Sequence, residues 1–218
     1  MIYSNKRKLA LSGWLQKNGE SEYKSALKLQ KFLLFYEAFS KVDGDTADFK
    51  ALKGYQRGPV FSTVWGDYTH ERESFDEAAK NAYSSNENMV ENDRAKKSKF
   101  LVSILSESEL SELTHKMHLW SSKAERIVQG ESQVELSEDA FDEEDARFIR
   151  ALERMYPLSF IEQSAIVKIG DHYFVLNKND EAKLTDQHLD VMRDVAEHEN
   201  LQNPVYVEID SEGRLIID

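Results

Sequence analysis

KLQKFLLFYEAF, residues 28–39, carries the clearest structural signal in the sequence. Its large apolar side chains recur at i, i+3, i+4 and i+7, the spacing that gathers residues on one face of an α-helix. These side chains are Leu29, Phe32, Leu33, Tyr36 and Phe39. Because the apolar face is wide, we expect a helix over residues 23–39 that is central and mostly buried. Residues 43–45, Asp-Gly-Asp, have the composition of a turn and end this helix.

A second distinctive stretch, YQRGPVFSTVW, occupies residues 55–65. A residue that precedes proline avoids the α conformation, and glycine adopts the alternatives at little cost, so Gly58-Pro59 interrupts regular structure. Proline lacks an N–H and therefore fits the first turn of a helix. We expect a helix from about residue 59 to residue 69, with residues 49–55 as a short linking segment before it.

Other helices are expected on both sides of a polar loop at residues 83–93. They cover residues 75–82, 97–105, 106–117 and 143–155. Ser106 followed by Glu109 is a capping-box pattern, which marks the start of the third of these helices. Pro157 ends the fourth. Residues 130–145 are acidic and poor in large apolar groups, so they are interpreted as a linker.

The last 55 residues change to strand patterns. Short apolar runs flank the turn sequences Gly170-Asp171 and 210–213, which predicts two hairpins with an amphipathic helix between them. The expected strands are 165–169, 173–176, 205–209 and 215–217, and the expected helix is 186–199. We therefore expect a mainly α N-terminal domain over residues 1–130 and a small α+β C-terminal unit over residues 131–218.

The composition is that of a globular protein, with 40% hydrophobic and 31% charged residues. No apolar run approaches the roughly 18 residues that a membrane helix needs, so no membrane span is expected. The first residues have no signal-peptide core, and the chain has no cysteine. Disulfides, thiolate zinc sites and cysteine nucleophiles are therefore absent, and we expect a cytoplasmic protein.

Charge is distributed unevenly along the chain. Residues 1–130 hold 20 Lys and Arg against 18 Asp and Glu, and residues 131–218 hold 8 against 22, which gives +2 and −14 of the total of −12. The acidic part repels phosphates and suits a partner with a basic surface, although such acid can also serve only solubility. A local basic patch (Arg94, Lys96, Lys97 and Lys99) does not outweigh this total, so nucleic acid is not the expected partner.

The sequence contains no cofactor or catalytic motif. It has no phosphate-binding loop, no dinucleotide-binding glycine fingerprint and no Gly-x-Ser-x-Gly elbow. His115 and His118 lie three apart on an expected helix and could share a face, but the spacing of a zinc site is missing. We expect no cofactor, no metal and no enzymatic activity.

Three segments taken together resemble the Panacea domain, also described as the SocA-like or phage-associated GepA-like domain. They are residues 28–39, residues 55–65 with their Gly-Pro-Val, and the Leu-Thr-His element of residues 110–115 followed by Trp120. Leu119 stands where that family usually has proline. The resemblance covers roughly residues 9–128 and depends on the order and spacing of the three segments.

The positions that match the family pattern can be stated one by one. They are Lys31, Tyr36, Arg57, Gly58, Pro59, Val60, Thr114, His115 and Trp120. Glycine followed by proline fixes a turn, and no nucleophile lies near it in the sequence. We therefore expect structural roles for these residues.

The resemblance implies an antitoxin that neutralises a cognate toxin by direct protein–protein contact. The toxin is expected to have a basic surface, with residues 131–218 contributing to partner choice. Two alternatives stay open, a proteolytic adaptor or regulator that delivers a client protein, and a hydrolase that uses His115. A homo-oligomer also stays open.

Overall fold

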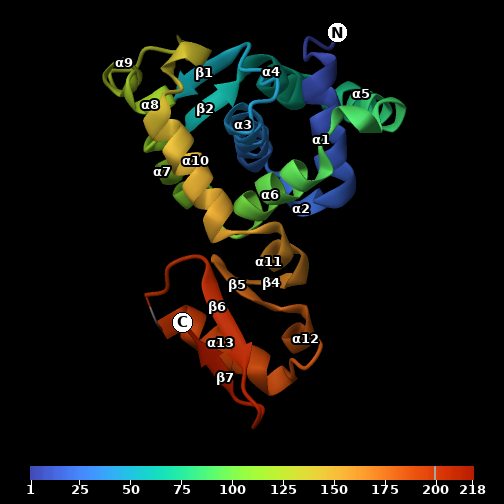
Figure 1. Cartoon of the computed structure of the whole chain (residues 1–218), viewed down its shortest axis with the longest axis vertical. Coiled ribbons are helices and arrows are strands. Elements are labelled where there is room, and N and C mark those ends of the chain that lie inside the picture. The colour runs from blue at the N-terminus through green and yellow to red at the C-terminus, as the bar shows by residue number, and fades with distance from the viewer. Residues whose placement is uncertain (199) are drawn as a thin grey trace. The chain divides into compact units, whose positions relative to one another are not determined.

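The central element of the N-terminal part is helix α3 (Ala26–Val42), drawn in the middle of that part in Figure 1. The computed structural model describes residues 1–198 and 200–218 of the chain. In α3, the Ser25 side chain accepts a hydrogen bond from the Lys28 N–H, so the helix begins three residues later than predicted. All residues from 28 to 40 are buried, which confirms a central buried helix.

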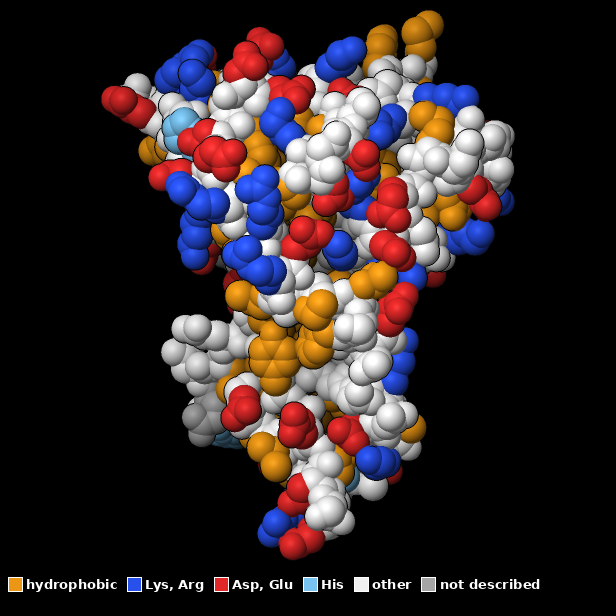
Figure 2. Space-filling view, in the orientation of Figure 1, with side chains coloured by type: hydrophobic (Ala, Val, Ile, Leu, Met, Phe, Trp, Pro, Cys, Tyr) orange, Lys and Arg blue, Asp and Glu red, His pale blue; other side chains and the backbone are white. Residues whose placement is uncertain are grey.

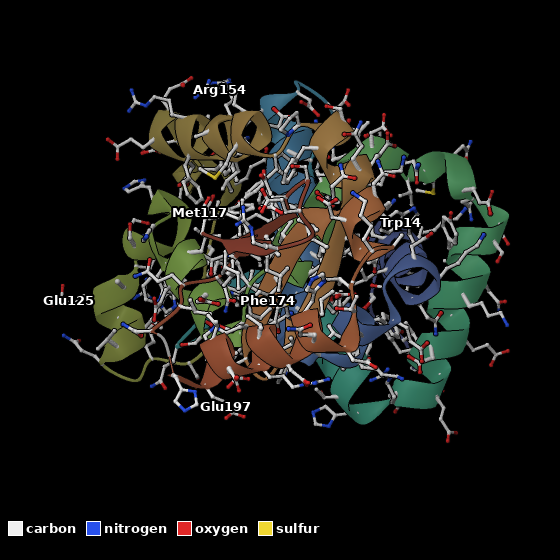
Figure 3. All side chains as sticks on the ribbon, turned by 90° about the horizontal axis from the view of Figure 1, so that it is seen from below. Trp14, Met117, Glu125, Arg154, Phe174 and Glu197 are labelled. Carbon is white, nitrogen blue, oxygen red and sulfur yellow. The ribbon has the colours of Figure 1, made fainter. Side chains whose placement is uncertain are left out.

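The other helices of this part surround α3. They are α1 (Lys6–Asn18), α2 (Glu20–Lys24), α4 (Ser62–His70), α5 (Arg72–Ser85), η1 (Glu87–Met89), α6 (Asn92–Ser103), α7 (Glu107–His115), α8 (His118–Ser121), α9 (Ala124–Val128), η2 (Glu138–Ala140) and α10 (Glu143–Met155). Trp14 of α1, labelled in Figure 3, is buried and stacks on Phe32 of α3. Helices α1 and α5 pack closely because Gly13 has no Cβ, which would lie 2.1 Å from the Ala79 carbonyl oxygen.

Two of the predicted helices have different limits. The helix expected over residues 106–117 ends at His115, and α8 is separate from it. The helix expected over residues 97–105 begins earlier, at Asn92, and the loop predicted at residues 83–93 is shorter because α5 continues to Ser85.

The prediction for residues 49–69 was wrong in its first half. Residues 52–61 form a β-hairpin of strands β1 (Leu52–Tyr55) and β2 (Gly58–Phe61), and the helix starts only at Ser62. Pro59 pairs with Gly54 inside the hairpin. A strand tolerates proline when it lies at a sheet edge, and β2 is an edge in the order β2-β1-β3.

A side chain from α3 closes that edge. The Phe61 N–H donates to Gln30 Oε1 at 2.8 Å, and Gln30 Nε2 donates to the Phe61 carbonyl at 3.5 Å. The amide of Gln30 thus replaces the backbone of a missing neighbouring strand.

Residues 131–156 belong to the N-terminal part of the fold. The chain divides into two compact units, residues 1–102 with 107–156, and residues 103–106 with 157–218. The boundary therefore lies at residue 156, and not at residue 130 as predicted. Strand β3 (Val134–Glu135) pairs with β1, and α10 packs against α3, so the acidic stretch interpreted as a linker is built into this unit.

The C-terminal unit confirms the predicted strand pattern. It contains α11 (Leu158–Gln163), β4 (Ser164–Ile169), β5 (His172–Asn177), α12 (Lys178–Glu181), α13 (Asp186–His198), β6 (Val205–Ile209) and β7 (Leu215–Ile217). The last residue of the predicted helix, 199, lies outside the described residues. The sheet has the order β4-β5-β6-β7, with β5 and β6 parallel and the other pairs antiparallel.

The core of this unit lies between the sheet and α13. A parallel pair of strands needs a crossover, which α12 and α13 provide between β5 and β6. Phe174, labelled in Figure 3, is fully buried and clusters with Met192 of α13 and Val207 of β6. Among all the described residues of the chain, no helix is long and apolar enough to cross a membrane.

Candidate functional site

The tight turn between β1 and β2 requires glycine at residue 58. Tyr55 pairs with Gly58, which leaves only two residues in the turn. Gly58 has φ +99°, a left-handed conformation that side chains with a Cβ rarely adopt. A Cβ there would lie 2.3 Å from Lys31 Nζ and 2.7 Å from Thr114 Oγ1. Glycine is therefore required both by the backbone conformation and by close packing.

Three other residues of the family pattern lie at the backbone of this turn. Lys31 Nζ donates to the Arg57 carbonyl at 2.8 Å, and more weakly to the Pro59 carbonyl at 3.5 Å. Trp120 Nε1 donates to the Tyr55 carbonyl at 3.0 Å. The ring of His115 lies beside the backbone of Gln56, and its buried Nε2 has no hydrogen-bond partner among the described residues. Side chains from α3, α7 and α8 thus converge on the β1–β2 turn.

His115 stacks on Trp120, with ring centroids 3.8 Å apart. Burial, followed by the nearby charge of Lys31, lowers the pKa of His115, while the adjacent Gln56 backbone acts in the opposite direction. The idea that His115 shares a helix face with His118 was wrong, because α7 ends at His115. His118 begins α8, and its Nδ1 lies 3.0 Å from an Asp142 carboxylate oxygen.

Lys31 is a buried cation with an unusual environment. Its side chain is 1% exposed, and within the described residues it forms no ion pair with a carboxylate. Burial, together with the positive charge of Arg57, lowers the pKa of Lys31 to about 7. Its charge is therefore balanced only by carbonyl dipoles of the turn.

Two of the remaining matched residues, Thr114 and Tyr36, form hydrogen bonds outside the turn. Thr114 Oγ1 donates to the Leu110 carbonyl at 3.0 Å within α7. The Tyr36 hydroxyl accepts from the Glu91 N–H at 2.8 Å, which links α3 to the start of α6. Tyr36 is thus not part of the turn, although the sequence pattern includes it.

A cleft of about 490 Å³ opens beside the turn. Its lining comes from the start of α3, the hairpin, α4, the start of α7, α9 and the loop before β3. The lining residues are Ala26, Leu27, Gln30, Lys31, Gly54, Tyr55, Gln56, Arg57, Val60, Trp65, Glu107, Ile127, Gly130, Glu131, Ser132 and Gln133. Apolar surface predominates in it, and the Trp65 side chain is 39% exposed. Three matched residues, Lys31, Arg57 and Val60, therefore belong to the cleft.

Two carboxylates in the lining are held by arginines. Arg57 and Glu107 form an ion pair at 3.0 Å, and Glu107 also accepts from the Ser25 hydroxyl at 2.6 Å. Glu131 pairs with Arg126 of α9 through both carboxylate oxygens. Glu125, on the same helix, extends from the edge of the molecule in Figure 3.

The sequence could not point to the cleft itself. Leu27, Trp65 and Ile127 come from three helices that no spacing rule connects. Trp65 offered the best signal, since it is a large aromatic side chain beside, and not within, the face of α4 that buries Val64 and Tyr68.

The predicted basic patch is largely neutralised by carboxylates. Arg94 is buried and pairs with Asp43 at 2.7 Å and with Asp45 at 2.6 Å. Lys97 pairs with Glu153 at 2.5 Å. Figure 2 shows acidic and basic side chains interspersed over the visible face of the N-terminal unit. In the described part of the chain, no group of three or more His, Asp or Glu residues could hold a metal ion.

Comparison of the chain with protein-family models, with curated proteins and with solved structures finds no match.

Proposed function

We propose that this protein is an antitoxin that neutralises a cognate toxin in the cytoplasm by direct protein–protein binding. The resemblance to the Panacea domain suggests the class of function. The observation that carries the proposal is the cleft beside the β1–β2 turn, which is mainly apolar and has the half-exposed Trp65 in its lining. Tryptophan in a pocket is typical of the few residues that dominate binding energy at interfaces.

The environment of the matched residues favours binding over catalysis. Lys31 and Trp120 are engaged with backbone carbonyls of the turn. No carboxylate in the described residues hydrogen-bonds to the His115 ring to orient it as a general base. The hydrolase alternative therefore has little support from the geometry.

Co-expression tests this proposal. The chain is produced together with the toxin encoded beside its gene, and both growth and complex formation are measured. We expect growth to be rescued and the two proteins to purify as one complex. A toxin that stays lethal and unbound would show the proposal to be wrong.

Two variants test the contribution of the cleft. Trp65→Asp places a charge in the lining and should weaken the complex at least about 10-fold, the effect of about 1.4 kcal/mol. Tyr3→Asp is the matched control, because Tyr3 is 71% exposed and does not line the cleft. Equal binding by both variants would move the contact surface away from the cleft.

The adaptor alternative draws support from the division into two compact units. Residues 157–218 hold 13 Asp and Glu against 5 Lys and Arg, a net charge of −8. An acidic unit of this kind suits a second partner with a basic surface, such as a protease to which the client is delivered. The half-life of the toxin with and without this protein separates the two functions, because a pure antitoxin leaves the half-life unchanged or lengthens it.

A further inference from the structure

We propose that the cleft beside the β1–β2 turn binds a segment of the toxin in which a large apolar side chain adjoins a carboxylate. This inference rests on the proposed function for the identity of the partner. The chemistry of the ligand is argued from the cleft alone.

The apolar part of the expected ligand is inferred from the apolar side chains that line the cleft. Leu27, Val60 and Ile127 contribute aliphatic surface from three different elements, and Trp65 contributes an aromatic ring. A volume of about 490 Å³ lies within the range of roughly 300–1,000 Å³ that is typical of ligand pockets. It has room for a side chain as large as tryptophan together with part of the adjoining backbone.

The anionic half follows from the charge balance of the lining. Four charged residues line the cleft, Lys31, Arg57, Glu107 and Glu131. Glu107 is matched by Arg57, and Glu131 is matched by Arg126. Lys31 is the charged lining residue that has no opposite charge among its described partners. The unmatched charge in the cleft is therefore positive.

Burial makes this unmatched cation an attractive partner for an anion. A charge that is removed from water interacts more strongly with an opposite charge, because the surroundings screen it less. A ligand carboxylate near Lys31 would favour its protonated form, which burial and the neighbouring Arg57 disfavour. His115 also responds to the charge of Lys31, so both groups can contribute to proton uptake when the ligand binds.

The backbone around the cleft supports a site rather than a chance hollow. Gln133, in the lining, has φ +55°, a left-handed conformation that costs energy in a residue with a side chain. Non-glycine residues that hold such conformations concentrate at binding and active sites.

The test uses a matched pair of probes on the purified chain of residues 1–218. N-acetyl-L-tryptophan has an apolar side chain next to a carboxylate, and N-acetyl-L-tryptophanamide is its neutral counterpart. Binding is followed by NMR of the backbone amides and by calorimetry in buffers of different ionisation enthalpy. We expect shifts at residues 54–57 and 130–133, about 10-fold tighter binding of the carboxylate than of the amide, and proton uptake with the carboxylate only.

Two variants keep the test decisive. Lys31→Met should abolish the preference for the carboxylate, and its thermal unfolding shows whether the fold survives. Should Lys31→Met fail to fold, Trp65→Ala still tests the site, because it should weaken both probes about equally. Equal affinities for the two probes in the wild-type chain would overturn the anionic half of the proposal. Shifts outside the cleft would overturn the site.

A competition experiment identifies the occupant. Saturating N-acetyl-L-tryptophan should displace the toxin from its complex with this protein. A probe that binds the cleft but leaves the toxin bound would show that the site serves a small carboxylate and not the partner, which would overturn the choice of occupant. Because the probes bind without any toxin, failure of the co-expression test leaves this result interpretable.

Discussion

The two compact units of this protein differ in whether they bury charged side chains. Every buried charged residue in the described part of the chain lies in the N-terminal unit. These residues are Lys8, Glu22, Lys28, Lys31, Glu37, Asp67, Arg94 and Asp145. The C-terminal unit has an apolar core around Phe174 and Met192, and its charged residues, where described, are not buried.

The difference shows what buried charges do in this fold. Glu37 accepts from Arg7, from Lys8 and from the Asp48 N–H, which ties α1 and the loop before β1 to α3. Asp145 similarly accepts from the first N–H groups of α8 at 2.7 and 2.8 Å. Each carboxylate joins segments that are distant in sequence. In the C-terminal unit, strand ladders and the apolar packing of α13 on the sheet hold the parts together instead.

The largest expected effect on stability comes from truncating the chain at one of the two candidate domain boundaries. A chain ending at residue 156 keeps β3 and α10, whereas a chain ending at residue 130 loses both. The second cut removes seven buried hydrophobic side chains: Val134, Leu136, Phe141, Ala146, Ile149, Leu152 and Tyr156. At roughly 1.5–3 kcal/mol for each large side chain, this loss rivals the whole stability of a typical domain, about 5–15 kcal/mol.

We therefore expect residues 1–156 to fold and residues 1–130 to be unfolded or aggregated. Circular dichroism and tryptophan fluorescence measure this, since all three tryptophans lie before residue 130. Similar cooperative unfolding of both fragments would return the boundary to residue 130.

The next prediction compares the loss of stability caused by one substitution in each unit. Glu37→Ala leaves the buried Lys8 with only the more distant Asp48 carboxylate, at 4.0 Å, and should destabilise the N-terminal unit by about 3–5 kcal/mol. Phe174→Ala opens a cavity and should destabilise the C-terminal unit by about 3–5 kcal/mol. Tryptophan fluorescence in urea should shift with Glu37→Ala only, because the C-terminal unit has no tryptophan. An equal shift with Phe174→Ala would mean that the units unfold as one.

The same contrast explains what the sequence could predict. The strands of the C-terminal unit and the helix α3 follow simple periodicity, because an apolar face decides their structure. The hairpin at residues 52–61 was not predictable, since its edge is closed by Gln30, a side chain from a distant helix. The stretch 130–145 was interpreted as a linker because its few large apolar residues, Val134, Leu136 and Phe141, lie among many acidic residues.

The candidate site was predictable only in its parts. The pattern identified Lys31, Gly58, His115 and Trp120, and the expectation of a turn at Gly58-Pro59 was useful even though the helix after it began later. The sequence could not show that Lys31 and Trp120 both donate to carbonyls of one turn. Hydrogen bonds of this kind depend on how α3 and α8 are placed in space.

A smaller effect compares one glycine from each unit. Gly58 and Gly213 both have positive φ, +99° and +79°, but a Cβ at Gly213 would meet nothing within 4 Å. Alanine in a left-handed conformation costs about 1–2 kcal/mol at either position. Gly58→Ala must also displace the Lys31 ammonium from the Arg57 carbonyl, so we expect a total of about 3 kcal/mol. Equal losses in thermal or urea unfolding would show that the turn is not tightly packed against Lys31.

The smallest effect concerns the pH dependence that a buried lysine gives to the N-terminal unit alone. The pKa of Lys31 is about 7 in the folded chain, below its ordinary value of 10.5. Between these values the unfolded chain holds a proton that the folded chain has released. The contribution of Lys31 to the free energy of unfolding therefore rises with pH across this window, by up to about 1.4 kcal/mol per pH unit.

Replacement of Lys31 by Met should remove this rise, so urea unfolding at pH 7 and pH 8.5 should show a smaller gain in stability than in the wild-type chain. Lys116→Met is the control, because Lys116 is exposed and follows directly after His115. It should keep the pH dependence of the wild-type chain, because Lys31 is present in this variant. The same slope in all three proteins would mean that Lys31 keeps its proton in the folded state. The cleft would then hold a permanent cation, and the predicted proton uptake on binding a carboxylate would have to come from His115.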